Sequence, residues 1–266
     1  VSLILANYIW NSRLFDDLDF RGHKLLDTHD RFGNREQNFR EQKELPEWFF
    51  CSEEDEKSAI ERSDITIAIT DVEERYFRDL SDGARTRVFC LGLRFAKPKN
   101  LPKAKKFRFG YLGSANPTNL QSIKDLSKKL ERSATPIQLH LYGPISNKLE
   151  GSSSAIVCNG SVKNISEFYS NIGCSLNADK HGTGLKIKSV EAICLGVPII
   201  STASGFSGIE SPYSFHQFST LDEMAEYISD FNKALIDELT QATEIVGTEY
   251  VSKVIEMEKE LEKLLN

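Results

Sequence analysis

The chain has 266 residues, of which 40% are hydrophobic and 27% charged, a composition that excludes a disordered protein and suffices for two α/β domains. The formal net charge of -6 argues against a nucleic-acid-binding protein, because such proteins usually carry a basic surplus. The five cysteines are scattered, which favours buried thiols in a reducing compartment over disulfides or zinc ligands. No run of about 18 apolar residues occurs, so no membrane-spanning segment is predicted.

Residues 1–94 alternate between patterns typical of strands and of helices, which predicts a domain with a parallel sheet. An apolar run at 1–6 predicts a strand leading into a helix, and Ser52 followed by three acidic residues predicts the start of a helix. The predicted strands are 1–6, 23–30, 65–69 and 86–91, and the predicted helices after the first are 52–62 and 72–80.

Polar residues at strand ends and in loops are the candidates for function in this part. His29 lies at the end of a predicted strand, where ligands bind in open α/β sheets, and it could act as a general base, donate to a substrate hydroxyl, or simply tie down the next loop. The segment 31–50 is polar and ends in Trp48-Phe49-Phe50, which predicts a long loop that ends in an aromatic cluster. This loop could cover an acceptor or touch a lipid surface, or its aromatic residues could belong to the core.

Asp17 and Asp19 have the D-x-D spacing of some metal sites, but two acids near a helix end are usually only solvated.

Residues 95–106 are rich in proline and lysine and predict an interdomain linker. The second domain, 107–225, repeats the alternation and is followed by helices over 226–266. Its predicted strands are 107–113, 137–143, 155–158, 172–177, 197–201 and 214–218, and its predicted helices are 120–130, 165–169 and 185–195.

The segment 182–200 carries the strongest chemical signal. Two close glycines precede the predicted helix, and a glycine turn that opens a helix presents unpaired amides and the positive end of the helix dipole, which together accept phosphate. Lys186 and Lys188 add positive charge in the first turn, and Glu191, one turn later, could bind a ribose. The alternative is an ordinary loop, helix and strand with surface lysines.

Several segments, taken in order, resemble glycosyltransferases of the GT-B type, closest to the family-4-like group (glycosyl transferases group 1). These segments are Phe109-Gly-Tyr-Leu-Gly-Ser114 with Asn119, Leu139-His-Leu-Tyr-Gly143, Gly160-Ser-Val-Lys-Asn-Ile165, Gly182-Thr-Gly-Leu-Lys-Ile-Lys-Ser-Val-Glu-Ala192 and Gly196-Val-Pro-Ile-Ile-Ser201. The resemblance implies an α/β fold with two Rossmann-like domains, of which the N-terminal one is incomplete.

The resemblance also assigns roles to residues of this chain. It implies that Glu191 binds the donor ribose and that Lys188, with Lys186 as the alternate, balances the charge of the diphosphate. His29 is expected to face the transferring sugar. The remaining residues expected to bind the donor are Gly113, Ser114, Asn119, Val162, Thr183, Gly184 and Leu185. Thr183 stands where many members have a second glutamate that touches the sugar, which leaves the sugar and the stereochemical outcome open.

The expected activity is therefore the transfer of a sugar from a nucleoside diphosphate to a hydroxyl group, with no metal or other cofactor and with retention, in polysaccharide or glycoconjugate assembly. The acceptor is expected to be a saccharide, a lipid-linked compound or a protein, and the location cytoplasmic, with peripheral membrane contact through residues 40–50. The alternatives are a nucleotide-sugar epimerase of the same fold and a non-catalytic nucleotide-sugar-binding subunit. A Rossmann oxidoreductase is disfavoured because no G-x-G-x-x-G precedes an acid at the required spacing.

Overall fold

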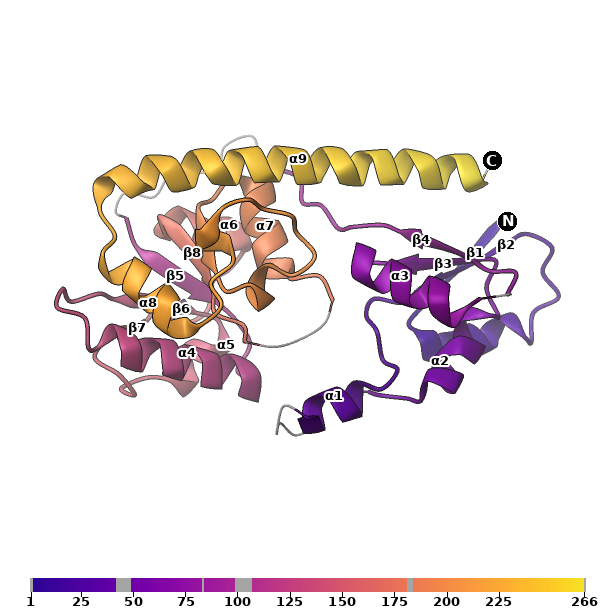
Figure 1. Ribbon diagram of the computed structural model, residues 1–266, viewed down its shortest axis with the longest axis horizontal. Helices are drawn as coiled ribbons and strands as arrows, with labels where there is room; N and C mark the ends of the chain where they lie inside the picture. The colour runs from indigo at the N-terminus through magenta and orange to yellow at the C-terminus, as the bar shows by residue number, and fades with distance from the viewer. Residues whose placement is uncertain (1, 42–48, 83, 99–106, 181–183, 266) are drawn as a thin grey trace. The chain divides into compact units, whose positions relative to one another are not determined.

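The computed structural model describes residues 2–41, 49–82, 84–98, 107–180 and 184–265, which divide into two compact units (Figure 1). Unit 1 consists of Val1–Leu93, Thr183–Leu185 and Lys253–Asn266, and unit 2 of Arg94–Gly182 and Lys186–Ser252. Each unit contains one parallel sheet. Within the part of the chain that is described, the apolar stretches of the helices are too short or too interrupted by charge to cross a bilayer.

The sheet of unit 1 has the strand order β1-β2-β3-β4, and every neighbouring pair is parallel. The strands are β1 (Leu3–Asn7), β2 (His23–Asp27), β3 (Ile65–Ala68) and β4 (Arg87–Cys90). The helices are the 3-10 helix η1 (Ile9–Phe15) and the α-helices α1 (Arg35–Glu41), α2 (Glu53–Ile60) and α3 (Asp71–Leu80). All four predicted strands are present, so the predicted alternation is confirmed.

Two side-chain caps determine where α2 and α3 begin. The Ser52 hydroxyl accepts a hydrogen bond of 3.1 Å from the Asp55 amide, which confirms the predicted N-cap. Thr70 accepts a bond of 3.2 Å from the Glu73 amide, so α3 begins at Asp71, one residue before the predicted start. The Thr70 cap fixes the chain as it leaves the carboxyl end of β3.

The sheet of unit 1 is covered on both faces, as parallel sheets are. Leu25 and Leu26 are neighbours in β2 and so point to opposite faces. Leu26 packs with the buried rings of Phe15 and Phe77, while Leu25 packs with residues of β3 and with the end of helix α9 (Lys233–Leu265). Helix α9 therefore contributes residues to both units.

The sheet of unit 2 has the order β7-β6-β5-β8-β9, again with parallel pairs throughout. Its strands are β5 (Phe109–Leu112), β6 (Leu139–Tyr142), β7 (Ile156–Cys158), β8 (Cys174–Asn177) and β9 (Ile199–Ser201). Its helices before α9 are α4 (Pro117–Leu130), α5 (Pro144–Lys148), α6 (Ile165–Asn171), α7 (Ile187–Leu195), η2 (Ser204–Phe206), η3 (Ser214–His216) and α8 (Leu221–Ser229).

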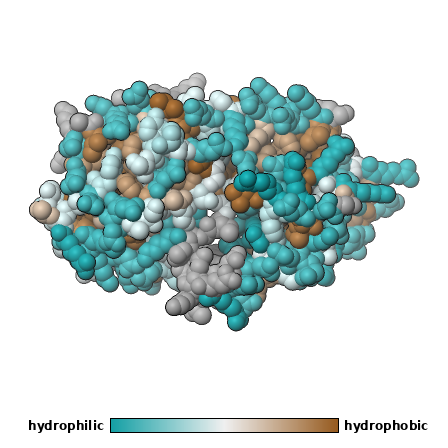
Figure 2. All heavy atoms as spheres, viewed as in Figure 1, coloured by the Kyte–Doolittle hydropathy of each residue, from teal (hydrophilic) through white to brown (hydrophobic). Residues whose placement is uncertain are grey.

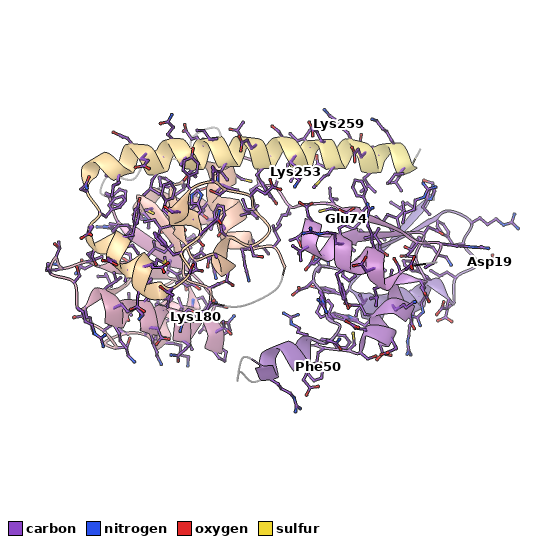
Figure 3. All side chains as sticks on the ribbon, in the orientation of Figure 1. Asp19, Phe50, Glu74, Lys180, Lys253 and Lys259 are labelled. Atoms are coloured by element: carbon purple, nitrogen blue, oxygen red, sulfur yellow. The ribbon has the colours of Figure 1, made fainter. Side chains whose placement is uncertain are left out.

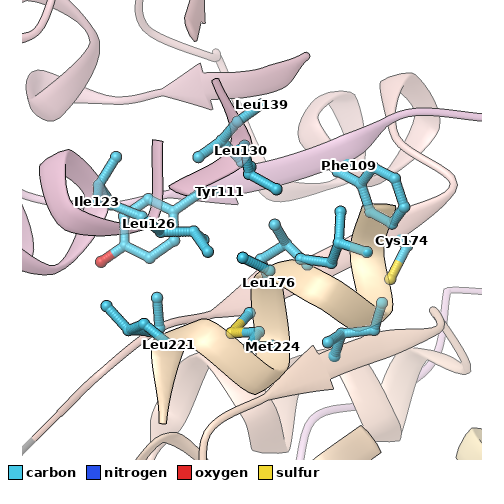
Figure 4. Close-up of a cluster of buried hydrophobic side chains, with 14 of the residues drawn as sticks. Phe109, Tyr111, Ile123, Leu126, Leu130, Leu139, Cys174, Leu176, Leu221 and Met224 are labelled. Atoms are coloured by element: carbon cyan, nitrogen blue, oxygen red, sulfur yellow. The ribbon is translucent and has the colours of Figure 1, made fainter. Parts of the chain in front are cut away.

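The main core of unit 2 lies between this sheet and the helices α4 and α8 (Figure 4). Tyr111 of β5 and Leu176 of β8 meet Leu126 of α4 and Met224 of α8 there, each at most 1% exposed. On the face of the molecule in Figure 2, hydrophilic residues cover most of the surface, as expected when the large apolar side chains lie inside.

Three sequence predictions need correction. Residues 214–216 of the predicted strand 214–218 form the 3-10 helix η3, in which the Gln217 amide donates a hydrogen bond of 2.9 Å to the Ser214 carbonyl, a bond that an extended strand does not make. Phe218 makes one isolated bridge to Thr202. The helix predicted over 185–195 begins at Ile187, and the predicted loop 31–50 contains α1. Most of the predicted linker 95–106 lies outside the described residues.

Candidate functional site

The candidate site of unit 2 lies where the order of its strands changes direction. The chain leaves the central strand β5 toward β6 and β7, and then returns to place β8 and β9 on the other side of β5. In open α/β sheets, the loops on either side of such a reversal diverge at the carboxyl ends of the strands, and ligands bind there. Ser114 follows β5, and Asp179 follows β8. Lys180, the next residue, is labelled in Figure 3.

Lys188 of α7 is the centre of a polar cluster at this edge. Its Nζ atom donates a hydrogen bond of 3.0 Å to the Tyr111 hydroxyl and lies 3.4 Å from the Asn119 Oδ1 atom. The same ammonium lies 4.8 Å from the centre of the Tyr111 ring. Its side chain is 29% exposed, so the charge is held by protein on one side and is accessible on the other.

An acid also faces this ammonium. The Asp179 Oδ1 atom lies 3.6 Å from Lys188 Nζ, and it is buried without a hydrogen-bond partner among the described residues. A buried carboxylate oxygen is costly unless a cation offsets its charge, so Asp179 and Lys188 depend on each other. Burial raises the pKa of Tyr111 well above its ordinary value, and the negative charge of Asp179 raises it further, so the hydroxyl stays neutral.

Asn119 connects this cluster to the turn after β5. The Asn119 Nδ2 group donates bonds of 3.1 Å to the carbonyl oxygen and to the hydroxyl of Ser114. Its backbone amide donates a hydrogen bond of 2.7 Å to the side chain of Asn116, the N-cap of α4. Gly113 packs directly on Tyr111, since a Cβ atom there would lie 2.6 Å from the Tyr111 ring. The structure thus brings together the predicted residues Gly113, Ser114, Asn119 and Lys188.

Glu191 lies three residues after Lys188 in α7, hence on the same side of the helix. It is half-buried, and its Oε2 atom accepts a bond of 3.2 Å from the Tyr169 hydroxyl. Burial raises the pKa of Glu191, and the bond from Tyr169 lowers it in part. Glu191 therefore does not point freely into solvent, and within the described chain its second oxygen has no hydrogen bond.

The other predicted donor residues are less fully described. Val162 is half-buried in the turn that follows β7, at the same edge of the sheet. Gly184 has a φ of +78° and Leu185 is buried, and both precede α7 in the chain. Lys186 is the N-cap residue of α7 and makes no side-chain cap bond. Thr183 lies outside the described residues, so its predicted role stays a prediction.

His29 lies at the carboxyl edge of the sheet of unit 1, after β2. Its Nε2 atom is 3.0 Å from Asn7 Oδ1 and 3.6 Å from Asp27 Oδ2, and its ring stacks on Tyr8 at 4.3 Å between centres. His29 and Tyr8 have φ angles of +61° and +67°, a strained region for residues other than glycine. These contacts fix the imidazole. Its predicted place opposite the sugar stays a prediction.

An aromatic cluster adjoins His29, and of the predicted aromatic segment 48–50 it contains Phe49, while Trp48 lies outside the described residues. Tyr8 also stacks on Trp10 at 4.6 Å, and Trp10 contacts Phe49 at 4.6 Å and Phe32 at 5.2 Å between ring centres. Tyr8, Trp10 and Phe49 are 38%, 41% and 44% exposed, so this cluster is only partly core.

The acidic groups offer little for a metal ion. Among the described residues, one group of three potential ligands lies within metal-binding distance, namely Asp71, Glu74 and Cys90. Asp71 forms an ion pair of 2.6 Å with Lys253, and Glu74 one of 2.6 Å with Arg78. Lys253 and Glu74 are labelled in Figure 3. Asp17 and Asp19 are exposed, as the solvated alternative predicted.

Sequence reasoning missed Tyr111 and Asp179. Tyr111 stands in a strand whose pattern indicates only burial, although it belongs to the Gly-Tyr-Leu-Gly segment that carried the resemblance. Asp179 follows β8 at the strand end where polar residues gather, and this position was the available signal.

Residues 106–230 match the model of the family described as Glycosyl transferases group 1, which confirms the predicted resemblance for this part of the chain. No curated protein sequence matches the chain.

Solved structures share the fold. A mutant of S. aureus TarM in complex with fondaparinux, alpha-GlcNAc-glycerol and UDP superimposes with a TM-score of 0.69 at 14% identity, over 99% of this chain and 54% of TarM. Anabaena HepE in complex with UDP-glucose gives 0.71 at 14% identity, over 98% of this chain and 79% of HepE. A UDP-forming α,α-trehalose-phosphate synthase from Burkholderia xenovorans, in complex with glucose-6-phosphate, gives a TM-score of 0.71 at 10% identity. This match covers 99% of this chain and 73% of the synthase. The chain thus has the GT-B type of fold with two Rossmann-like units, as predicted, and spans about half the length of TarM.

Proposed function

We propose that this chain belongs to a glycosyltransferase that moves a sugar from a nucleoside diphosphate to a hydroxyl group of an acceptor. The observation that carries the proposal is the Lys188 cluster, in which a fixed ammonium group stands at the strand-order reversal of a unit matching group 1 glycosyltransferases. The UDP in the TarM complex and the UDP-glucose in the HepE complex support the choice of donor.

In this proposal, the bond between the sugar carbon C1 and the diphosphate oxygen breaks, and its electron pair stays on the diphosphate. The acceptor oxygen forms the new bond to C1, and its proton leaves with the diphosphate or to solvent. Negative charge develops on the leaving group, so the Lys188 ammonium and the amides at the start of α7 stabilise the transition state more than the bound donor.

Two further residues have complementary roles. Glu191, half-buried one turn after Lys188, offers its second oxygen to a ribose hydroxyl. His29, held by Asn7 and Tyr8, orients the sugar or the acceptor hydroxyl. Because the ammonium and amides balance the leaving charge, the reaction is proposed to proceed without metal. Retention of configuration, a role in polysaccharide or glycoconjugate assembly, and a cytoplasmic location with peripheral membrane contact complete the proposal.

The test measures donor binding first and turnover second. Thermal unfolding of the full chain is followed with UDP, GDP, ADP and TDP, since a ligand at a hundredfold excess over its Kd stabilises the native state by about 2.7 kcal/mol. The matching radiolabelled nucleotide sugar is then incubated with saccharide acceptors, and the labelled product is isolated.

We expect one nucleotide to stabilise the chain, Lys188→Met to reduce this effect, and Lys124→Met, which removes an exposed lysine of α4, to retain it. Binding without any transfer would instead favour a non-catalytic subunit. Conversion of the donor into an isomeric nucleotide sugar without an acceptor would favour an epimerase. Either result contradicts the proposed function.

A further inference from the structure

A second cavity lies at the amino ends of the strands of unit 1, the edge of the sheet opposite to His29. It encloses about 660 Å³, a volume in the range of small-molecule sites. Its wall includes His23 and Arg87, the first residues of β2 and β4, and Leu264 near the end of α9. The cavity is thus separate from the strand ends where the proposed transfer takes place.

The wall of this cavity is basic. It contains five arginine or lysine side chains and two acidic ones, although the whole chain has a net charge of -6. Two of the cations are committed to protein groups: Lys24 Nζ donates 2.7 Å to the Phe15 carbonyl, and Arg62 pairs at 2.8 Å with Asp16. The other three are exposed and have no partner among the described residues, namely Arg21, Arg85 and Arg87.

The two acids in the wall do not neutralise these arginines. The Asp64 Oδ2 atom accepts a bond of 2.8 Å from the backbone amide of Lys24. Glu61 lies 3.9 Å from Lys57, a residue of its own helix turn. Both carboxylates are therefore directed to other groups, and the excess positive charge in the cavity remains.

The backbone explains why the arginines converge. Arg87 is the first residue of β4 and pairs in register with Ile65, the first residue of β3. Arg85 lies in a bend two residues before Arg87, and both residues line the same cavity. Like charges at short range repel one another, and a bound anion would relieve this repulsion.

A cavity in unit 2 offers a useful contrast. It encloses about 580 Å³ and is also lined by lysines, but Lys129 pairs there with Asp222, and Lys180 with Asp125. Its positive charge is therefore largely compensated within the protein. The cavity of unit 1 differs because its three arginines form no ion pair with any acid that the structure describes.

We propose that the cavity of unit 1 binds a ligand with two or more phosphate groups, through Arg21, Arg85 and Arg87. A guanidinium group matches phosphate through two parallel N–H donors and never loses its charge, which makes arginine the preferred partner of such groups. Three arginines around 660 Å³ suit more than one phosphate. The phosphates belong either to a soluble phosphorylated compound or to the headgroups of an anionic membrane.

The first arm of the test uses tripolyphosphate as the soluble probe. Its binding to the full chain is measured by calorimetry for the wild type, for Arg21→Gln/Arg85→Gln/Arg87→Gln, and for the control Arg13→Gln/Arg75→Gln/Lys148→Gln. The control removes three exposed cations outside the cavity and has the same net charge. We expect at least a tenfold weaker Kd for the cavity variant and a change below twofold for the control.

Hydrogen exchange of the wild type locates the bound probe. Tripolyphosphate should protect peptides that cover residues 20–26 and 84–90, including in Lys188→Met, in which the proposed donor site is disabled. Protection confined to peptides around residues 111–119 and 186–191 would place the phosphate in unit 2 and would contradict this proposal. Circular dichroism of the cavity variant checks that it is folded, as expected when only exposed side chains change.

The second arm uses vesicles of phosphatidylglycerol, with phosphatidylcholine vesicles as the neutral comparison. Sedimentation with the anionic vesicles alone, lost in the cavity variant and kept in the control, would identify headgroups as the source of the phosphates. Binding of tripolyphosphate without sedimentation would identify a soluble ligand. If neither probe binds the wild type, or if the cavity variant binds as well as the control, the proposal is wrong.

Discussion

The ammonium of Lys188 donates a 3.0 Å hydrogen bond to the hydroxyl of Tyr111 and lies 4.8 Å from the centre of the same ring. Tyr111 belongs to the central strand β5 and is only 1% exposed, so it cannot move without disturbing the core of unit 2. The flexible side chain of Lys188 is therefore held in one place by a rigid residue. A positioned charge of this kind stabilises a transition state without reorganising during the reaction.

Lys188→Met should lower kcat for sugar transfer at least tenfold, about 1.4 kcal/mol of transition-state stabilisation. Methionine keeps much of the length of the lysine stem but carries no charge. Steady-state kinetics at saturating donor measure the effect, with Lys124→Met as the exposed-lysine control. Full turnover by the Lys188→Met variant would show that another group balances the leaving diphosphate.

The same variant leaves Asp179 without its cation, which lowers stability for a reason unrelated to catalysis. The double variant Lys188→Met/Asp179→Asn removes this uncompensated charge. We expect it to recover thermal stability while its kcat stays low. Recovery of both together would mean that Lys188 acts only as a structural partner of Asp179.

Glu191→Gln should weaken binding of the preferred nucleoside diphosphate by about ten- to a hundredfold, because hydrogen bonds to charged groups contribute about 1.5–3 kcal/mol. The amide can still accept from Tyr169, so the fold is preserved. The wild type should bind the 2′,3′-dideoxy nucleotide as weakly as the variant binds the natural one. If the wild type and Glu191→Gln showed the same ratio of Kd values for the natural and the dideoxy nucleotide, Glu191 would not be the residue that binds the ribose.

His29→Gln separates turnover from donor binding. Lys188 and Glu191, the proposed partners of the nucleotide, belong to unit 2, whereas His29 belongs to unit 1, so the Kd of the nucleoside diphosphate should change less than twofold. Turnover should fall at least tenfold because the imidazole no longer orients the reacting groups. Calorimetry with the nucleotide and product formation with its sugar check the two parts. An unchanged kcat would return His29 to the alternative role of tying down its loop.

The strands of both sheets could be predicted because buried parallel strands are short apolar runs that turn residues interrupt. The strand predicted over residues 214–218 was wrong. Phe215 and Phe218 suggest a strand, whereas His216 is held inside the protein by its contacts with Phe206 and Ser211. A buried histidine between two aromatic residues follows from tertiary packing, which no local pattern encodes.

The candidate site was predictable where one continuous segment carries it. Lys188 and Glu191 stand on one helix after a glycine-rich turn, and Ser114 and Asn119 follow one strand. Asp179 could not be assigned, because it meets Lys188 only once β8 has paired with β5.

Glu73 should make unit 1 less stable as the pH rises. It is 3% exposed, and burial, reinforced by the negative charge of Asp30, raises its pKa from 4.5 to about 8. The folded state therefore holds the proton more tightly than the unfolded state does, so this stability is present below pH 4.5 and is lost as the pH rises through about 8. Glu73→Gln, which stays neutral, should flatten the dependence in denaturant titrations. Both tryptophans lie in unit 1, so their fluorescence reports the unfolding of this unit. If the stability of Glu73→Gln depended on pH as strongly as that of the wild type, the prediction would be wrong.

His216 should have the opposite effect in unit 2. The imidazole is fully buried, stacks on Phe206 at 4.4 Å between ring centres, and its Nδ1 lies 2.7 Å from the Ser211 hydroxyl. Its Nε2 atom has no partner among the described residues, so a proton there would be a buried, unpaired charge. Burial accordingly lowers the pKa of His216 from 6.5 to about 4.

Because the unfolded state binds this proton more readily, unit 2 should lose stability as the pH falls from 6.5 toward 4, by about 3 kcal/mol in all. His216→Asn cannot titrate in this range and should lose less on acidification, although the smaller side chain makes it less stable at neutral pH. Hydrogen exchange of peptides covering residues 199–231 measures this for unit 2 alone. His23→Asn, which changes a half-exposed histidine of unit 1, should leave the acid sensitivity of these peptides as it is in the wild type. If His216→Asn and the wild type lose protection in parallel between pH 6.5 and 4, other groups govern the acid response.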